Sequence, residues 1–506
     1  MAAARPLAVC LGMGAAMVAS VQLSRRHRQF WRSFQTTTPA GSGRAALPMR
    51  RLDASGSSAV GADAVRDLEA HPRFLECVQQ LSRVDSVRVS KETITVVQVG
   101  VAAVAGRRGG HGYRLTETNL ATRNHFPYVV DSSLNWDNRK MTLLRQLQVL
   151  DADVVCLEEL SDYWTFFKPE LHDLGYDSVY VKRPSIHVST WSGEKKQDGC
   201  GIFYKYVDQP TKRLATYLME GKDKFELKEC ESINFHDPHD RVAMLALLKM
   251  RHFAQYVLVG CTHLWWNPKK VDHQMAEIFE LEEEIIRMSS DVKDKYEHDL
   301  AKTVTGSDNV PIIICGDFNN SPESPLYAYM ENTFMQKPNV EGAQDAFSSA
   351  YSGYHANTQL TRPQDAPQVE LPEGKKDEPP HTTVNFRRCW TIDYIWHSTS
   401  GLVPTRVLEI PSEAVLRSEE GPPDWFNRLA MLDSYSKLGR LPSGFQGNHN
   451  GIPNSRFGSD HVPLMAEFAF VAPPANRGGG RGYQDDDEQL SHGWEDDEET
   501  KAYLVS

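Results

Sequence analysis

Four short stretches place ionisable or polar residues where an apolar, strand-like run ends. They are Asp153–Glu159 (DVVCLEE), Gly260–His263 (GCTH), Cys315–Asn320 (CGDFNN) and Gly458–His461 (GSDH), and a fifth, Thr391–Tyr394 (TIDY), carries an acid inside such a run. The ends of buried strands hold side chains rigidly, and α/β proteins place reactive groups there. We therefore expect the five stretches to form one site.

These side chains suit the hydrolysis of a phosphate ester. Glu159 and Asp460 offer hard oxygen ligands, which Mg²⁺ prefers, with Mn²⁺ as an alternative ion. A cation held there would stabilise negative charge on the phosphoryl oxygens and on the leaving group. The two carboxylates therefore indicate a divalent-metal site.

The remaining polar residues fit the other roles in such a reaction. Asp317 is expected to orient or deprotonate the attacking water, and Asn319 to donate hydrogen bonds to the phosphate. His461 would hydrogen-bond the phosphate as charge builds, with Asp393 fixing the imidazole tautomer. His263 would be a second acid or phosphate contact.

Taken singly, the same residues are typical of ordinary structure. An acid at a strand end is commonly a cap or a solvated side chain, and a single histidine is commonly structural. The GDFN stretch alone could be a turn in which Gly316 supplies a special backbone dihedral. The specificity therefore lies in the ordered set of motifs.

That ordered set resembles the endonuclease/exonuclease/phosphatase superfamily. The matching stretches are CLEE at 156–159, THLWWNP at 262–268, CGDFNNSPES at 315–324, TIDYIW at 391–396 and SDH at 459–461. The carbon catabolite repressor-type branch, with the poly(A) deadenylases, nocturnin and the Angel proteins, is similar in four further stretches: LNWDNRK at 134–140, QDGCGIFYK at 197–205, EPPHTT at 378–383 and SDHVPLMAEF at 459–468. The resemblance covers residues 93–470.

The resemblance implies an α/β fold, a four-layer sandwich of two mixed β-sheets face to face with helices outside. It also implies Glu159 as a metal ligand, Asp460 as a second one, and Asp198 in a substrate-binding stretch near the active site. The remaining roles that it implies agree with those above for the catalytic set Asp317, Asn319, Asp393, His461 and His263.

Three departures from the family pattern bear on these expectations. Gly100 stands where the first strand of the family carries a metal-holding Asn, and Cys261 stands where Asn commonly precedes Thr-His. If Val99–Tyr113 is an insertion, Asn119 is a candidate replacement metal ligand; otherwise Asn119 is an ordinary loop residue. No leucine-rich-repeat docking region for a scaffold partner is recognisable.

The composition separates the chain into four parts. Residues 1–52 are an N-terminal targeting or anchor segment, 53–92 a linker and lead-in, 93–470 the catalytic domain, and 471–506 a disordered acidic tail. The leader has no acid before Asp53, an apolar run at Pro6–Leu23 and four arginines shortly after it. This composition predicts targeting to an organelle, with the mitochondrion favoured, or a membrane anchor that leaves the catalytic domain facing the cytoplasm.

Apolar periodicity predicts the main elements of the catalytic domain. Met141–Leu150 and Val271–Met288 have helical spacing, and short buried strands are expected at 153–157, 256–261 and 311–315. Trp390–Trp396 and Val462–Phe470 alternate like late strands, whereas Thr361–Pro380 is expected to be a surface loop and Pro411–Asn454 an insertion.

From these observations we expect a Mg²⁺-dependent phosphodiesterase, a 3′-to-5′ RNA exonuclease of deadenylase type. The formal net charge is −12, so an RNA substrate needs a local basic cleft or bound cations. One alternative is a phosphodiesterase or phosphatase acting on a small nucleotide or a phospholipid. The other is a catalytically impaired binding module, which the altered first strand motif would explain.

Overall fold

The computed structural model describes residues 72–84, 86–101, 126, 128–184, 198–206, 224–236, 240–306, 310–336, 346–361, 371, 373–385, 388–417 and 451–473. Contacts divide the chain into Met1–Val60 and Gly61–Ser506, and every described residue lies in the second unit. The leader, the acidic tail and Asn119 lie outside the described residues.

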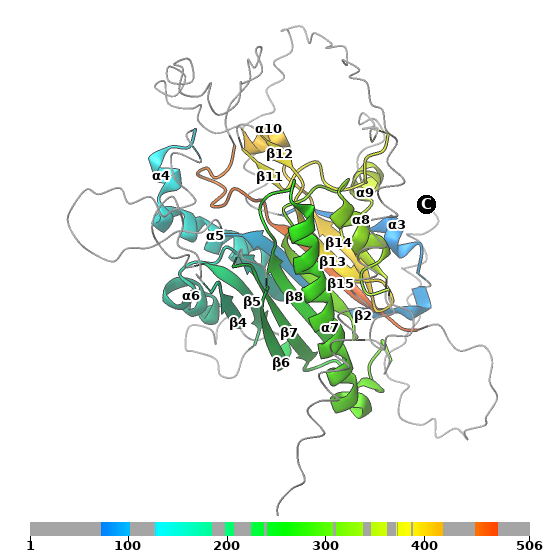
Figure 1. Ribbon diagram of the computed structural model, residues 1–506. Helices are drawn as coiled ribbons and strands as arrows, with labels where there is room; N and C mark the ends of the chain where they lie inside the picture. The colour runs from blue at the N-terminus through cyan, green and yellow to red at the C-terminus, as the bar shows by residue number, and fades with distance from the viewer. Residues whose placement is uncertain are drawn as a thin grey trace, which may run out of the picture. The chain divides into compact units, whose positions relative to one another are not determined.

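The first sheet has seven strands in the order β1-β14-β15-β2-β3-β5-β4 (Figure 1). Only the β2–β3 pair is parallel, so the sheet is mixed. Its strands are β1 (Phe74–Glu76), β2 (Val89–Gly100), β3 (Val154–Glu158), β4 (Tyr176–Lys182), β5 (Gly199–Lys205), β14 (Leu402–Leu408) and β15 (Leu464–Val471).

The second sheet has six strands in the order β10-β13-β9-β8-β7-β6, with β8 and β9 parallel. Its strands are β6 (Phe225–Asn234), β7 (Val242–Met250), β8 (Tyr256–His263), β9 (Ile312–Asp317), β10 (Phe347–Ser349) and β13 (Asp393–Ser398). A separate pair, β11 (Thr383–Val384) and β12 (Cys389–Trp390), lies with α10 (Glu413–Leu416) at one end of the sheets in Figure 1.

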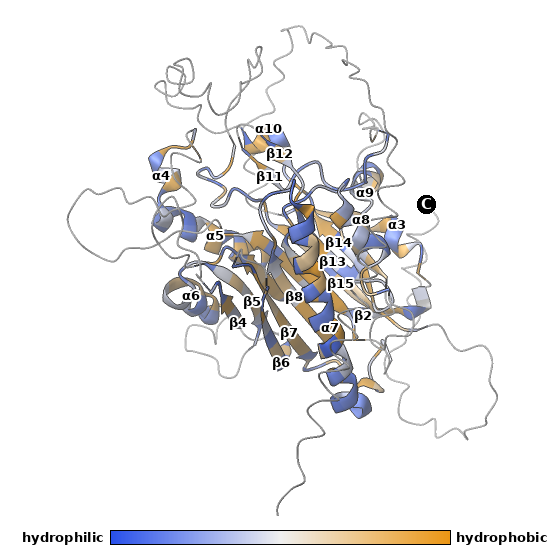
Figure 2. Cartoon of the chain, in the orientation of Figure 1, coloured by the Kyte–Doolittle hydropathy of each residue, from blue (hydrophilic) through white to orange (hydrophobic). Residues whose placement is uncertain are grey.

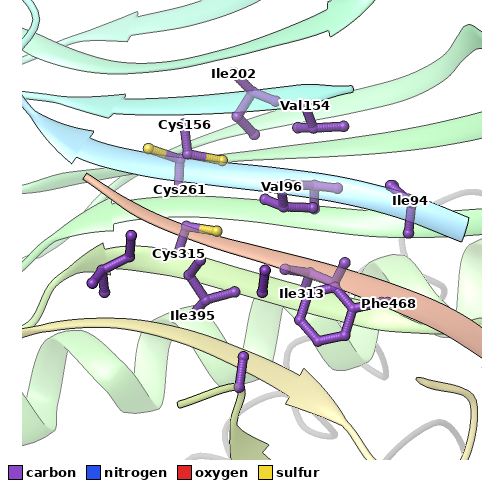
Figure 3. Close-up of a cluster of buried hydrophobic side chains, with 14 of the residues drawn as sticks. Ile94, Val96, Val154, Cys156, Ile202, Cys261, Ile313, Cys315, Ile395 and Phe468 are labelled. Carbon is purple, nitrogen blue, oxygen red and sulfur yellow. The ribbon is translucent and has the colours of Figure 1, made fainter. Parts of the chain in front are cut away.

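The two sheets face each other across one apolar core, shown in Figure 3. Val96 and Phe468 project from the first sheet, and Ile313 and Ile395 from the second, into the same buried layer. Successive residues of a strand point to opposite faces, so alternate residues of these runs fill this core. The remaining apolar residues face the helices, which explains why the strands read as nearly continuous apolar runs.

Helices cover the outer faces of both sheets. On the first sheet, Leu143, Leu144 and Leu147 of α5 (Trp136–Leu150) pack against Val97 and Val155, and α6 (Lys168–Asp173) and η2 (Tyr163–Phe167) join them. Across the second sheet runs α7 (Val271–Leu300), with α8 (Pro325–Asn332) beside it; in Figure 2 its outward side is hydrophilic and the strands behind it are apolar. The remaining short helices are α3 (Val78–Leu81), η1 (Ser86–Arg88), α4 (Asp131–Leu134) and α9 (Tyr354–Thr361).

These layers run helix, sheet, sheet, helix, which confirms the predicted four-layer sandwich. The expected helices at 141–150 and 271–288 are parts of α5 and α7, and the three expected buried strands are β3, β8 and β9. The sheet begins at Phe74, because β1 pairs with β14, and therefore starts ahead of the predicted boundary at residue 93. No helix among the described residues is long and apolar enough to cross a membrane.

One predicted strand is wrong in its extent. Trp390–Trp396 is not a single strand, because β12 ends at Trp390 and β13 begins at Asp393, in different sheets. Between them the Thr382 hydroxyl accepts hydrogen bonds from the backbone N–H groups of Ile392 (3.1 Å) and Asp393 (3.2 Å). A side chain thus replaces a strand partner at this point, and the alternation of apolar residues does not reveal it.

Candidate active site

Three predicted residues lie side by side across neighbouring strands of the second sheet. His263 ends β8, Asp317 ends β9, and Asp393 begins β13. In the register, His263 is opposite Asp317, and Asp317 is opposite Asp393. The parallel β8–β9 pair and the antiparallel β9–β13 pair therefore bring the ends of two strands and the start of a third to one edge.

His461 lies beside these three residues, although it belongs to the segment that leads into β15 of the first sheet. Its Nδ1 atom lies 2.9 Å from Oδ2 and 3.0 Å from Oδ1 of Asp393. The backbone at His461 forms an isolated bridge with Thr383, and its N–H donates to the Ser459 hydroxyl at 3.1 Å. Although burial opposes protonation, the charges of Asp393 and Asp460 raise the pKa of His461 well above its ordinary value.

Asp317 lies between the two histidines and is 5% exposed. Its Oδ1 accepts the backbone N–H of Asn319 at 2.8 Å, and its Oδ2 is 3.5 Å from Nε2 of His263. Burial and the adjacent Asp393 carboxylate raise the pKa of Asp317 to about 8. Nearby positive charge, from His461 or from a cation, favours its ionised form.

A second set of carboxylates, Glu159, Asp198 and Asp460, faces the same region. Burial and the like charges of Asp198 and Asp460 raise the pKa of Glu159. Glu159 also lies 3.9 Å, Oε1 to Nδ1, from His263. A divalent cation would relieve this mutual repulsion, and carboxylate oxygens are ligands that Mg²⁺ and Mn²⁺ accept. Carboxylates such as Glu159 and Asp460 therefore fit the predicted metal.

A more compact group of candidate ligand atoms, from Asp317, Asp393 and His461, lies within 4.8 Å of one another. Asp393 in that group already binds His461 and accepts hydrogen bonds from Thr382 and, at 3.1 Å, from Gln98. With its oxygens so engaged, we assign this group to proton handling. The metal role stays with the carboxylates around Glu159, and it stays a prediction.

The other predicted residues have defined surroundings. Asn319 adopts a left-handed φ of 53°, and its Nδ2 donates to the Leu264 carbonyl at 3.1 Å. Asp198 is 4% exposed and forms an ion pair with Arg183 at 3.2 Å, so its carboxylate is not open to solvent. The Asp460 carbonyl accepts the Thr383 hydroxyl at 2.7 Å.

Two glycines of the motifs are explained by close backbone approach. A Cβ on Gly316 would lie 2.1 Å from the Thr262 carbonyl oxygen, and one on Gly458 would lie 2.6 Å from the Arg139 carbonyl oxygen. Gly316 lies within β9, and its φ is not positive, so the turn dihedral considered for it is wrong. These contacts let β9 and the SDH loop approach their neighbours without a side chain between them.

Gly100 pairs with Glu158 at the end of β2, and a Cβ there would lie 3.5 Å from Cγ of His461. The position where the family carries its Asn therefore borders the candidate histidine. Nearby, Gln98 donates to Glu158 at 2.9 Å, and the Cys261 thiol donates to the other Glu158 oxygen at 3.3 Å. Burial raises the pKa of Glu158 to about 8. Gln98 and Cys261 thus hold a buried carboxyl group beside Asp393.

Sequence reasoning did not assign Gln98, Glu158, Arg139 or Arg241 to the site. Gln98 had a signal, because it is the one polar residue in the apolar run Val96–Val99. Arg139 is 1% exposed and donates to the Gly458 carbonyl at 3.0 Å. Arg241 directly precedes the apolar strand β7, and a polar residue at the start of a strand is too common to serve as a signal.

Comparison with known proteins finds relatives by sequence. The model of the Endonuclease/Exonuclease/phosphatase family matches residues 284–461. The CCR4-Not complex 3′-5′-exoribonuclease subunit Ccr4 of Neurospora crassa is 26% identical over 387 residues, which are 69% of this chain and 44% of that protein. Carbon catabolite repressor protein 4 homolog 4 of Arabidopsis thaliana is 25% identical over 397 residues, 71% of this chain and 78% of that protein.

Solved structures are also similar. The human Nocturnin catalytic domain with bound sulfate is 17% identical, covers 80% of this chain and 99% of its own, and has a TM-score of 0.46. ANGEL2, described as a 2′,3′-cyclic phosphatase, is 20% identical, covers 79% of this chain and 98% of its own, and has a TM-score of 0.48. The chain spans less than half the length of the Ccr4 subunit of Neurospora crassa.

The family match over residues 284–461 and the Ccr4 relatives agree in the class of protein that they indicate. They confirm the resemblance to the endonuclease/exonuclease/phosphatase superfamily. Within it, the relatives bear the names of the carbon catabolite repressor-type branch.

Proposed function

We propose that this chain is a divalent-metal-dependent phosphodiesterase that shortens single-stranded RNA from its 3′ end. The observation that carries the proposal is the His461–Asp393 pair beside Asp317 at one edge of the sandwich. The Ccr4 relatives, which are named 3′-5′-exoribonuclease subunits, support the direction of cleavage.

Each side chain has a task in the proposed reaction. Asp317 holds the attacking water and takes its proton, because its carboxylate is fixed by the Asn319 N–H. His461, positively charged against Asp393, stabilises negative charge on the phosphoryl oxygens. Asn319 donates one amide hydrogen to Leu264 and keeps the other for the phosphate.

The metal complements these residues. A divalent cation bound by Glu159, with Asp460 nearby, would supply charge stabilisation for the phosphoryl oxygens and the leaving group. The chain's own residues then provide the orientation, because His263 lies between Glu159 and Asp317 and fixes the spacing of the two carboxylates.

Exposed aromatic rings favour single-stranded RNA over a small substrate. Trp266 is 57% exposed and follows His263 by three residues, and Trp390 is 39% exposed and precedes Asp393 by three. The Arg388 guanidinium lies 4.3 Å from the centroid of the Trp390 ring. Flat rings with a cation nearby bind the faces of unpaired bases.

The test is a substrate panel with the purified chain and Mg²⁺: 5′-labelled oligoadenylate, mixed-sequence RNA, single-stranded DNA, a dinucleotide cofactor and sphingomyelin. Progressive shortening of RNA from the 3′ end, lost in Asp317→Ala and His461→Ala, is the expected result, with turnover reduced ~10²–10⁴-fold in each. Thermal melting of both variants checks that they fold.

Other outcomes of the panel select the alternatives. Release of phosphate from the dinucleotide or the lipid, without RNA cleavage, would assign the site to a small-molecule phosphodiesterase. RNA binding with no turnover on any substrate would indicate a catalytically impaired binding module. Turnover that survives both Asp317→Ala and His461→Ala would reject the proposed site.

A further inference from the structure

The start of β7 reaches the active-site edge, because β7 runs antiparallel to β8. Ala243 of β7 pairs with Thr262 of β8, so Arg241, just ahead of β7, lies beside the loop that follows His263. The residue before it, Asp240, has a left-handed φ of 61°, a conformation that costs energy for a non-glycine residue. The backbone is thus held in a special shape immediately before Arg241.

Among the described residues, Arg241 is a buried arginine whose guanidinium lacks hydrogen-bond partners, although its backbone carbonyl accepts the N–H of Phe235 at 3.1 Å. It is 4% exposed, and its Nε and Nη1 atoms are buried with no hydrogen-bond partner. No carboxylate of the described residues lies close enough to form an ion pair with it. A buried guanidinium is costly unless it is paired, so a missing anionic partner is expected.

The ring of Trp265 holds the guanidinium in place, with its centroid 5.8 Å from Cζ of Arg241. The Trp265 backbone is itself fixed by helix α7, since its N–H donates to Glu277 at 2.8 Å and its carbonyl accepts Gln274 at 2.7 Å. A cation above a rigid ring is oriented without having its hydrogen-bond donors used.

The charges around Arg241 place it on the Glu159 side of the site. Burial and the positive charge of Arg183 lower the pKa of Arg241, whereas Glu277, Glu159 and Asp198 act in the opposite direction. Arg183 is committed elsewhere, since it donates to the Asp240 carbonyl at 3.0 Å and to Asp198 at 3.2 Å. Of the two arginines, Arg241 is therefore the one whose guanidinium can donate hydrogen bonds to a ligand.

We propose that Arg241 binds a substrate phosphate that neighbours the scissile one. This inference rests on the proposed function. The scissile phosphate belongs beside His461 and Asp317 of β9, whereas Arg241 precedes β7, which β8 separates from β9 in the sheet. A guanidinium fork offers paired donors that match phosphate oxygens.

Substrate preference follows from this placement. A substrate with two successive phosphodiesters reaches both His461 and Arg241, whereas a substrate with one reaches only the catalytic group. The site should therefore select oligonucleotides over compounds with a single phosphodiester. Hydrolysis of a phosphate ester by itself would not require this selection.

The experiment compares two substrates that differ by one nucleotide, ApA with one phosphodiester and ApApA with two, with wild type, Arg241→Met and Arg241→Lys. We expect Arg241→Met to lower kcat/KM for ApApA by about 10- to 100-fold, mainly through KM, and to leave ApA unchanged. Arg241→Lys should fall between, because lysine keeps the charge but loses the fork. Arg251→Met, at the other end of β7 with its guanidinium over Tyr206, is the matched control and should change neither substrate.

A binding measurement provides a second readout. In the His461→Ala background, log Kd for ApApA plotted against log salt concentration should lose about 0.7 of its slope when Arg241 becomes Met, the value for one phosphate contact on a single strand. If Arg241→Met does not fold, Arg241→Gln, which also removes the charge, is used in both measurements.

The outcomes separate this inference from the proposed function. An equal loss on ApA and ApApA, or no loss on either, overturns the phosphate role and leaves Arg241 as a buried counter-charge, while the RNase activity stands. If the wild-type protein cleaves neither compound nor longer RNA, the proposed function fails and this inference fails with it.

Discussion

Nδ1 of His461 lies 2.9 Å from Oδ2 of Asp393, although 68 residues separate the two in the chain. Asp393 is 1% exposed and is also held by Thr382 and Gln98, so the carboxylate is fixed before it orients the ring. Its charge and that of Asp460 favour the protonated imidazole. Nε2 makes no hydrogen bond with the described residues and is the nitrogen left for the substrate.

The first prediction concerns this pair. Asp393→Asn keeps the shape of the side chain but removes the charge that orients and protonates His461, so kcat should fall ~10²–10⁴-fold with little change in KM. Steady-state kinetics on oligoadenylate measures it. Asp299→Asn, which alters an exposed carboxylate paired with Lys249 at 2.8 Å, is the matched control. A kcat within a few-fold of wild type would mean that Asp393 is not an orienting group.

The second prediction concerns the metal. Glu159→Gln should weaken Mn²⁺ or Mg²⁺ binding at least about tenfold, because an amide replaces the carboxylate whose Oε1 lies 3.9 Å from Nδ1 of His263. Isothermal titration with the metal alone measures the affinity without relying on turnover. Glu284→Gln, on the outer surface of α7, serves as the control. Unchanged affinity in Glu159→Gln would move the metal site to other carboxylates.

The third prediction concerns the form of RNA that the site accepts. On a hairpin with a 3′ tail, shortening should stop close to the stem, because paired bases cannot stack on Trp266 and Trp390. A sequencing gel of the 5′-labelled hairpin shows the stop. Removal of the stem at the rate of the tail would contradict single-strand selection.

The fourth prediction is a pH dependence of stability from a buried group outside the candidate site. Burial lowers the pKa of His397, beside Phe468, to about 4. Below its ordinary pKa near 6.5 the unfolded chain takes up a proton that the folded chain does not, so stability falls as the pH drops from 6.5 toward 4.

The variant His397→Gln isolates that contribution. Relative to this variant, wild type should lose about 2 kcal/mol of unfolding free energy between pH 7 and pH 5. Urea denaturation at the two pH values gives the difference. Parallel pH profiles for the two proteins would show that His397 takes up its proton equally in both states.

The fifth prediction concerns residues 1–50, which lie outside the described residues. Their arginine-rich, acid-free composition should direct a fused fluorescent reporter to an organelle, with the mitochondrion expected, or to a membrane. Imaging with organelle markers decides between them. A diffuse cytosolic signal would reject both, and the chain without this segment should retain its activity in vitro.

The sequence by itself determined the elements and most of the candidate residues. Leucines at helical spacing located α5, and apolar runs that end in polar residues located β3, β8 and β9. His263 and Asp317 were recognisable for the same reason, because each ends such a run. These features are local, because the burial pattern of a single helix or strand follows from the order of apolar and polar residues within it.

Only the tertiary structure decided which strand starts meet those strand ends. Arg241 enters the site because β7 is antiparallel to β8, and Asp393 does so because β13 is antiparallel to β9. Gln98 joins them because β2 passes beside β3 and faces the second sheet. Strand order and direction come from pairing between distant segments, whose energy depends on the packing of the whole sandwich and not on the residues of any one strand.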